Sequence, residues 1–142
     1  ACDMLVAADN AMFVMAYSSV GLSPDGGGTW HLARSLPRAT AMRLLMFGER
    51  ASADQWLQWG VVSHLTTPGQ ALHEALTLAQ RLGERAGNAL ASIKELVNDA
   101  SHDPLHTHLS HERRHFVRNL HHANAAEGIQ AFLAKRAPRY IP

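Results

Sequence analysis

One carboxylate in this sequence stands in a setting that suits acid–base chemistry. Asp25 lies between Pro24 and three consecutive glycines, within the stretch Gly21 to Trp30. A proline followed by glycines predicts a tight turn, which leaves the acid with little side-chain cover beside the next helix. Local chemistry allows two interpretations: an aspartate that caps that helix, or an exposed carboxylate that serves as a general acid or base.

A second pattern could bind a metal ion. His111, Glu112 and His115 match HExxH, in which two histidines one helical turn apart bind zinc and the glutamate acts as general base. His121 stands where the extended motif has its third ligand, but the required glycine is replaced by Arg118, and on a continuous helix His121 points away from the other two. We therefore expect a solvated or inter-subunit helical face and no metal; a zinc hydrolase is a minor alternative.

Composition limits the classes of protein to consider. The chain has 142 residues, 46% hydrophobic and 18% charged, which is enough for one globular domain with a core. A net charge of +1 without a basic cluster argues against nucleic acid or an anionic membrane as partner. No apolar run approaches the roughly 20 residues that span a bilayer. The single cysteine, Cys2, suits a reducing compartment, and we expect a cytoplasmic protein.

The chain starts in the middle of an apolar pattern, which predicts the back part of something longer. Three short strands are expected, at residues 4–8, 12–16 and 61–65. Ser52 and Gln55 have the spacing of a capping box at the start of a helix. The other expected helices cover residues 29–36, 39–47, 72–82, 89–100, 105–122 and 127–135.

Several separated motifs, taken in order, resemble the enoyl-CoA hydratase/isomerase family, the crotonase superfamily. They lie at residues 1–3, 7–13, 21–29, 45–53, 59–62 and 127–136. The resemblance implies an α/β fold, a spiral of short strands and helices that is mostly helical here. It implies an acyl-CoA substrate, no resident cofactor, and a homotrimer or dimer of trimers. Residues 1–68 would form the acyl pocket and residues 69–142 the helical oligomerisation region.

The resemblance also assigns catalytic roles. Hydratases of the family use two glutamates; one lies before this sequence and the other corresponds to Tyr17, whose phenol, with a pKa of about 10, is a poor base. Some isomerases carry an aspartate in the Pro-Asp-Gly-Gly context, where it moves a proton within unsaturated or ring-derived acyl-CoA, including ring-epoxidised phenylacetyl-CoA. Asp25 is then the acid–base group, with Tyr17 on the pocket wall and an apolar lining from Met15, Leu22, Pro24 and Trp30.

Two further expectations follow from the resemblance. The oxyanion-hole amides would lie upstream of Ala1, so the chain alone should be weakly active or inactive. Phe132 and Lys135 would lie near the nucleotide end of CoA, although a core phenylalanine and a solvated basic tail are the alternatives. Isomerisation is the leading hypothesis. The alternatives are an enoyl-CoA hydratase and a non-catalytic CoA-binding or oligomerisation module.

Overall fold

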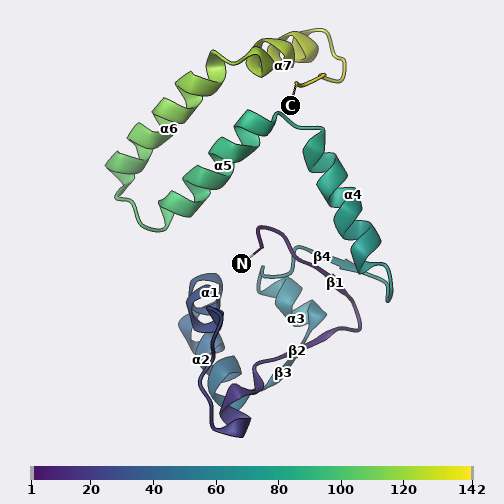
Figure 1. Ribbon diagram of the computed structural model, residues 1–142, viewed down its shortest axis with the longest axis vertical. Helices are drawn as coiled ribbons and strands as arrows, with labels where there is room; N and C mark the ends of the chain where they lie inside the picture. The colour runs from purple at the N-terminus through teal and green to yellow at the C-terminus, as the bar shows by residue number, and fades with distance from the viewer. Residues whose placement is uncertain (1, 142) are drawn as a thin grey trace. The chain divides into compact units, whose positions relative to one another are not determined.

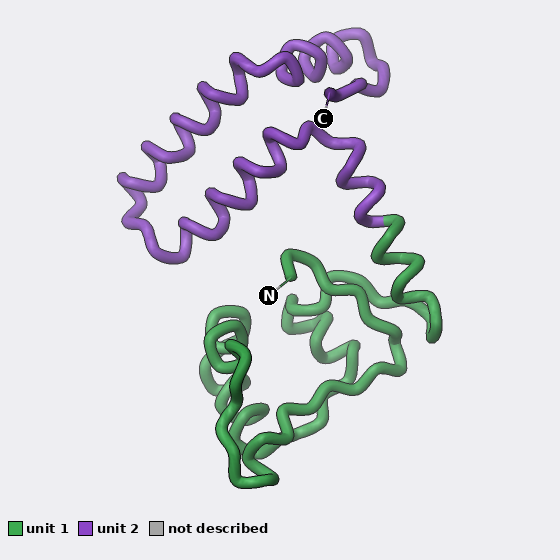
Figure 2. The backbone as a smooth tube through the Cα atoms, in the orientation of Figure 1, with its two compact units in different colours: residues 1–77 green, residues 78–142 purple. Residues whose placement is uncertain are grey.

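The computed structural model describes residues 2–141 and divides the chain into two compact units, residues 1–77 and 78–142 (Figure 2). The division falls inside helix α4, Ala71–Gly83. The pocket region, residues 1–68, and the oligomerisation region, residues 69–142, stay predictions. The chain is mostly helical, with short strands confined to the first unit (Figure 1).

The strands of the first unit form two separate pairs. β1, Val6–Ala8, pairs in parallel with β4, His64–Thr66. β2, Met12–Val14, pairs antiparallel with β3, Arg50–Ser52. The sequence did not predict β3, because three residues that lead directly into a helix carry no alternating pattern. The described residues therefore have four strands, one more than expected.

Helices connect these strands along the chain. They are the 3-10 helix η1, Ala16–Val20, and the α-helices α1, Gly28–Ser35, α2, Arg38–Phe47, and α3, Ala53–Gln58. The predicted capping box starts α3: Ser52 Oγ accepts from the Gln55 N–H at 3.3 Å, and Gln55 Oε1 accepts from the Ser52 N–H at 2.9 Å. Both free donors at this helix start are thus satisfied.

The core of the first unit lies between α1, α2, α3 and the strands. Leu44 and Val62 are its largest fully buried side chains, and Trp56 packs against Phe13 with ring centroids 5.2 Å apart. The expected strand over residues 61–65 begins later, at His64. The N–H groups of Val61 and Val62 both donate to the Trp56 carbonyl, so these two residues continue the turn that ends α3.

The second unit contains the rest of α4 and three more helices. They are α5, Gly87–Ala100, α6, Leu105–Leu120, and α7, Ala123–Leu133. α5 and α6 pack side by side as a hairpin, joined partly by Asn119, whose amide donates to Ser92 Oγ at 2.9 Å. α7 begins earlier than predicted, because the His122 ring accepts a hydrogen bond from the Asn124 N–H and caps the helix.

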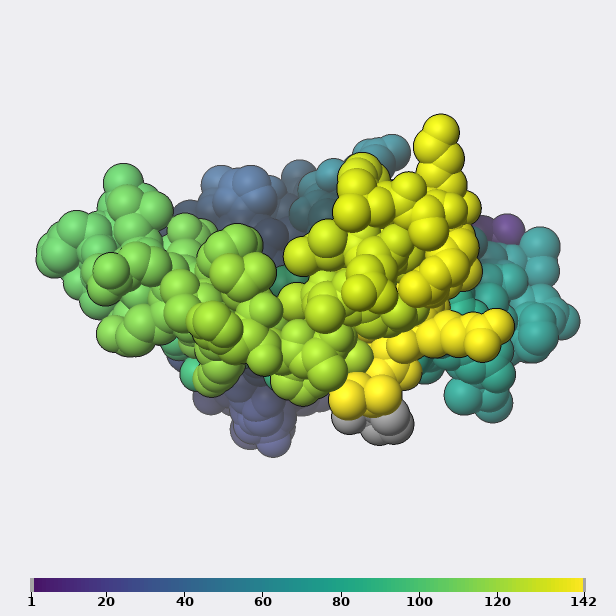
Figure 3. Space-filling view, turned by 90° about the horizontal axis from the view of Figure 1, so that it is seen from above, coloured from purple at the N-terminus to yellow at the C-terminus, as the bar shows by residue number. Residues whose placement is uncertain are grey.

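Much apolar surface of the second unit is exposed. Phe132 and Leu133 on α7 are 82% and 74% exposed, and Phe116 on α6 is 68% exposed. Figure 3 shows the surface of α6, α7 and the tail after them in green to yellow. Among residues 2–141, no helix combines the length and the apolar character needed to cross a membrane.

Candidate active site

Asp25 is the first residue of a turn whose backbone conformation favours glycine. Gly26 and Gly27 both have positive φ, 57° and 84°, and the Gly28 N–H donates to the Asp25 carbonyl at 3.1 Å. Two successive residues with positive φ are costly for any residue with a Cβ atom. The glycines after Asp25 thus reverse the chain and start α1.

The carboxylate of Asp25 is held from the side of η1. The Tyr17 hydroxyl donates a hydrogen bond to Asp25 Oδ1 at 3.0 Å. η1 is followed by its C-cap Gly21, with φ 73°, and the Leu22 N–H donates to the Tyr17 carbonyl. This reversal brings the next residues back toward Tyr17. The N-cap of α1 is Gly27, so the first interpretation, in which Asp25 caps α1, is wrong.

This hydrogen bond changes the chemistry of the phenol. The bond to Asp25 and the charge of that carboxylate raise the pKa of Tyr17 above its ordinary value of 10.0, since both favour the protonated phenol. Tyr17 is therefore a hydrogen-bond donor at neutral pH. Asp25 itself is exposed. It accepts the hydrogen bond from Tyr17 through Oδ1.

The four residues expected to line the acyl pocket differ in burial. Met15 is partly buried and packs against the core of the first unit, and Pro24 is half-buried beside Gly28. Leu22 is 66% exposed and Trp30 50% exposed. Leu22, before Asp25 in the sequence, and Trp30, after it, therefore both expose apolar surface.

Trp30 is held in place by its neighbours on α1. The Arg34 guanidinium lies 3.9 Å from the centroid of the indole ring, and the His31 ring meets it edge-on at 4.8 Å. Cation–π and edge-to-face contacts restrict the ring. Trp30 thus offers a fixed aromatic surface on the helix that follows the Asp25 turn.

Lys135 follows the C-cap of α7 in an unusual conformation. Its φ is 52°, the only positive φ of a residue other than glycine among residues 2–141. Its N–H donates to the Phe132 carbonyl, and the Arg136 N–H donates to the Ala131 carbonyl, which is the Schellman arrangement at a helix end. Lys135 and Phe132 are both exposed, so the alternative of a core phenylalanine is wrong.

A salt bridge ties the tail after Lys135 to α7. Arg136 donates to both carboxylate oxygens of Glu127, at 2.6 and 2.9 Å, and the Arg139 N–H donates to Oε1 at 2.7 Å. The hydrogen bonds from Arg136 and then Arg139 lower the pKa of Glu127 from 4.5 to about 2. The basic tail is therefore folded back on α7 at this point.

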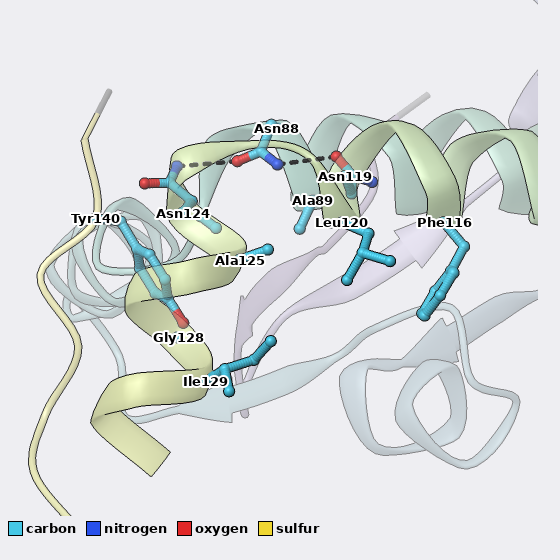
Figure 4. A pocket seen from close by; sticks show the side chains of 11 residues that line it. Asn88, Ala89, Phe116, Asn119, Leu120, Asn124, Ala125, Gly128, Ile129 and Tyr140 are labelled. Carbon is cyan, nitrogen blue, oxygen red and sulfur yellow. Dashed lines mark hydrogen bonds between the residues drawn. The ribbon is translucent and has the colours of Figure 1, made fainter. Parts of the chain in front are cut away.

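The second unit also has a surface cavity of about 470 Å³ that the sequence did not indicate (Figure 4). Asn88 joins its polar rim: it donates to Asn119 at 2.8 Å and accepts from Asn124 at 2.9 Å. Phe116, Leu120, Ile129 and Tyr140 are among the apolar lining. The sequence feature that could have indicated this cavity is the presence of asparagines inside helices. Asparagine is unfavourable in a helix interior unless its side-chain amide is hydrogen-bonded.

The HExxH residues turn to separate partners. His111 Nδ1 lies 3.0 Å from Asp103 Oδ2, whereas His115 contacts Arg118 at 2.9 Å and Glu95 at 3.8 Å. α6 ends at Leu120, so the premise of a helix continuing through His121 and His122 is wrong. In the described part of the chain, the ligand atoms that lie close to that of His111 belong to Asp99 and Asp103. His115 is not a member of this group.

Comparison with known proteins identifies the family. The model of the enoyl-CoA hydratase/isomerase family matches residues 1–141, and the chain belongs to this family. It is 39% identical over 138 residues to the 1,2-epoxyphenylacetyl-CoA isomerase of Escherichia coli K12, covering 97% of this chain and 53% of that protein. It is 36% identical over 142 residues to the carnitinyl-CoA dehydratase of Salmonella typhi, covering 97% and 54%.

Solved structures agree on the fold. An enoyl-CoA hydratase from Polaromonas sp. JS666 superposes with a TM-score of 0.95 at 61% identity, covering 99% of this chain and 55% of that one. Another, from Geobacillus kaustophilus HTA426, gives 0.93 at 35% identity with the same coverage. The expected crotonase fold is confirmed. The chain spans about half the length of the relatives it matches.

Proposed function

We propose that this chain supplies the acid–base group of a CoA-ester isomerase, with Asp25 moving a proton between carbons of an unsaturated or ring-derived acyl-CoA. The observation that carries the proposal is an exposed carboxylate on a glycine turn, held through Oδ1 by the Tyr17 phenol. In the first step Asp25 takes a proton from a carbon acidified by the thioester, and the electron pair of the broken C–H bond moves onto the thioester oxygen. In the second step Asp25 returns the proton to another carbon.

The state of Tyr17 favours isomerisation over the two-glutamate hydration mechanism. A hydratase of that type needs a second carboxylate, and this chain has a phenol at the corresponding position. The raised pKa of Tyr17 keeps it protonated, so it does not act as a base at neutral pH. Its role is to orient Asp25 by donating a hydrogen bond.

Two observations support a ring-derived acyl group as substrate. One relative is named as an isomerase of 1,2-epoxyphenylacetyl-CoA, which places phenylacetate catabolism among the roles to test. Trp30 is half exposed, and we propose that an aromatic substrate ring packs against the part of the indole that the Arg34 guanidinium does not cover. The proposed pocket wall consists of Trp30 with Leu22, Met15 and Pro24.

A hydratase or dehydratase is the second candidate, and the 61% identical Polaromonas structure, described as an enoyl-CoA hydratase, favours it. The relative from Salmonella typhi is named as a dehydratase. In this case Asp25 alone would handle the proton of the water that is added or removed. The two candidates differ in their products, since hydration increases the mass of the acyl group by one water and isomerisation leaves it unchanged.

The remaining parts of the proposal concern binding and assembly in the cytoplasm. Phe132 and Lys135 are proposed to contact the nucleotide end of CoA. Other exposed apolar side chains of the second unit are proposed to become buried in a homotrimer or dimer of trimers. A non-catalytic CoA-binding or oligomerisation module is the alternative. Light scattering with CoA calorimetry separates the two: a trimer that binds CoA without turnover supports the module.

The decisive experiment compares Asp25→Asn with Asp54→Asn in a protein of the relatives' length that contains these residues. Asp54 is an exposed acid in the first turn of α3, so its variant controls for lost charge. Asp25→Asn should lower isomerisation of cis/trans-enoyl and ring-epoxidised acyl-CoA roughly 100- to 10,000-fold, with Asp54→Asn near wild type. Undiminished turnover in Asp25→Asn contradicts the proposal, and a product heavier by one water supports the hydratase.

A further inference from the structure

Side chains from the end of α5, the following turn and α6 converge at one place in the second unit. Asp99, Asp103 and His111 each offer one ligand atom, and the three atoms lie within 4.8 Å of one another. His111 Nδ1 lies 3.0 Å from Asp103 Oδ2 and 4.0 Å from Asp99 Oδ2. The cluster thus combines an imidazole nitrogen with two carboxylates from separate elements.

His108 lies beside this cluster, outside the three converging ligand atoms. Its Nδ1 lies 3.9 Å from Asp103 Oδ2, and its Nε2 lies 3.7 Å from Glu112 Oε1. A histidine with one nitrogen toward the cluster and the other toward a carboxylate has the arrangement that commonly orients metal-binding imidazoles. Glu112 is then an outer partner that sets the orientation of His108.

One atom of the cluster and one of His108 are buried without a hydrogen-bond partner. They are Asp103 Oδ2 and His108 Nδ1. The 3.0 Å contact of Asp103 with His111 has the length of a hydrogen bond but not its direction. Buried polar atoms almost always have a partner, and a cation between these atoms would satisfy both of them.

We propose that Asp99, Asp103, His108 and His111 form a zinc site that links the end of α5 to α6. Imidazole nitrogen and carboxylate oxygen are zinc ligands, and donor atoms of a tetrahedral site with bonds of about 2.0–2.1 Å lie roughly 3.3 Å apart. The histidine nitrogens lie 3.0 to 4.0 Å from the carboxylate oxygens of Asp103 and Asp99, and the ligand atoms of Asp99, Asp103 and His111 lie within 4.8 Å of one another. Side-chain rotations would draw these donors together around the ion, and two carboxylates neutralise the divalent charge.

This site differs from the one that the HExxH pattern suggests. The two share His111, but His115 points to Glu95 and Arg118 instead, and Glu112 would orient a ligand instead of activating water. The proposed zinc is structural: it closes the hairpin of α5 and α6, independently of the chemistry at Asp25.

The test is zinc calorimetry on the full chain without an affinity tag, with thermal unfolding as a second readout. Asp103→Asn keeps the shape of the side chain and His111→Ala removes the imidazole. His115→Ala is the matched control on the same helix, and it also tests the HExxH alternative. We expect one zinc per chain, affinity lowered roughly tenfold or more in Asp103→Asn and His111→Ala, and unchanged affinity in His115→Ala.

Zinc should also raise the unfolding temperature of the wild type and of His115→Ala but not that of Asp103→Asn, because a ligand that binds only the folded state stabilises it. Circular dichroism shows whether each variant is folded. Zinc binding that does not saturate at millimolar concentration overturns the proposal. So does an equal loss of affinity in His115→Ala and His111→Ala.

Discussion

The hydroxyl of Tyr17 lies 3.0 Å from Oδ1 of Asp25 and donates a hydrogen bond to it. The two residues belong to different elements, η1 and the glycine turn before α1. This contact links the Tyr17 phenol to the carboxylate that we propose as the acid–base group. It also gives each side chain a separate role, with the phenol as donor and the carboxylate as proton carrier.

Tyr17→Phe should lower turnover less than Asp25→Asn does. The substitution removes the donor but leaves the carboxylate, so we expect a loss of about tenfold, as for the removal of one hydrogen bond. Steady-state kinetics of the two variants test this. A loss in Tyr17→Phe as large as that in Asp25→Asn would assign the chemistry to the phenol.

The raised pKa of Tyr17 is open to direct measurement, because the chain has two tyrosines and Tyr140→Phe leaves only Tyr17. In that background, Asp25→Asn should move the tyrosinate absorbance transition to lower pH. The sign for stability follows: the folded-state pKa is raised, so the contribution is present below about pH 10 and is lost as the pH rises through the folded value. A transition at the same pH in both proteins would contradict the hydrogen bond.

Gly27 should tolerate a side chain poorly. Gly27→Ala places a Cβ at φ 84°, 3.3 Å from Cδ2 of the His31 ring, and we expect a loss of roughly 1–2 kcal/mol in unfolding free energy. Gly28→Ala is the matched control, since its φ is not positive and its Cβ would lie 3.7 Å from Pro24. Denaturant unfolding of both variants measures the difference, and equal stabilities would contradict the described turn.

Much of the secondary structure could be predicted from the sequence, because several elements are specified by a few consecutive residues. The capping box of Ser52 and Gln55 needs only four consecutive residues, and the structure confirms it. β3 was missed because a three-residue strand depends on its partner β2. The start of α7 was misplaced because His122 is a rare capping residue.

The candidate site was only partly predictable for the same reason. Asp25 could be selected from its proline and glycines, but its bond to Tyr17 depends on the reversal at Gly21, which no short pattern specifies. The HExxH pattern directed attention to His111 and His115, one helical turn apart. The partners that His111 meets instead, Asp99 and Asp103, come from the end of α5 and from the turn that connects α5 to α6.

Glu127 should make the second unit sensitive to acid. Its folded-state pKa of about 2 is below the ordinary 4.5, so its contribution to stability is present above pH 4.5 and is lost as the pH falls toward 2. Glu127→Gln should remove that part of the acid dependence, whereas Glu84→Gln, at an exposed residue after α4, should keep it. Unfolding curves at several pH values test this, and identical acid profiles for both variants would refute it.

Lys135 allows stability and CoA binding to be separated. Its φ of 52° is strained for a residue with a Cβ atom and natural for glycine at this position of a Schellman motif. Lys135→Gly should therefore stabilise the chain by about 0.5–1 kcal/mol. Ala134→Gly is the control, because Ala134 has φ −82° and glycine there should destabilise.

If Lys135 contacts a phosphate of CoA, as proposed, the same Lys135→Gly variant should bind CoA more weakly while unfolding at a higher temperature. Loss of a positive charge removes an attraction to phosphate that glycine cannot replace. Calorimetry with CoA and thermal unfolding of one protein sample measure both effects. A variant that is more stable and binds CoA as the wild type does would leave Lys135 as a strained helix end and remove it from the proposed binding site.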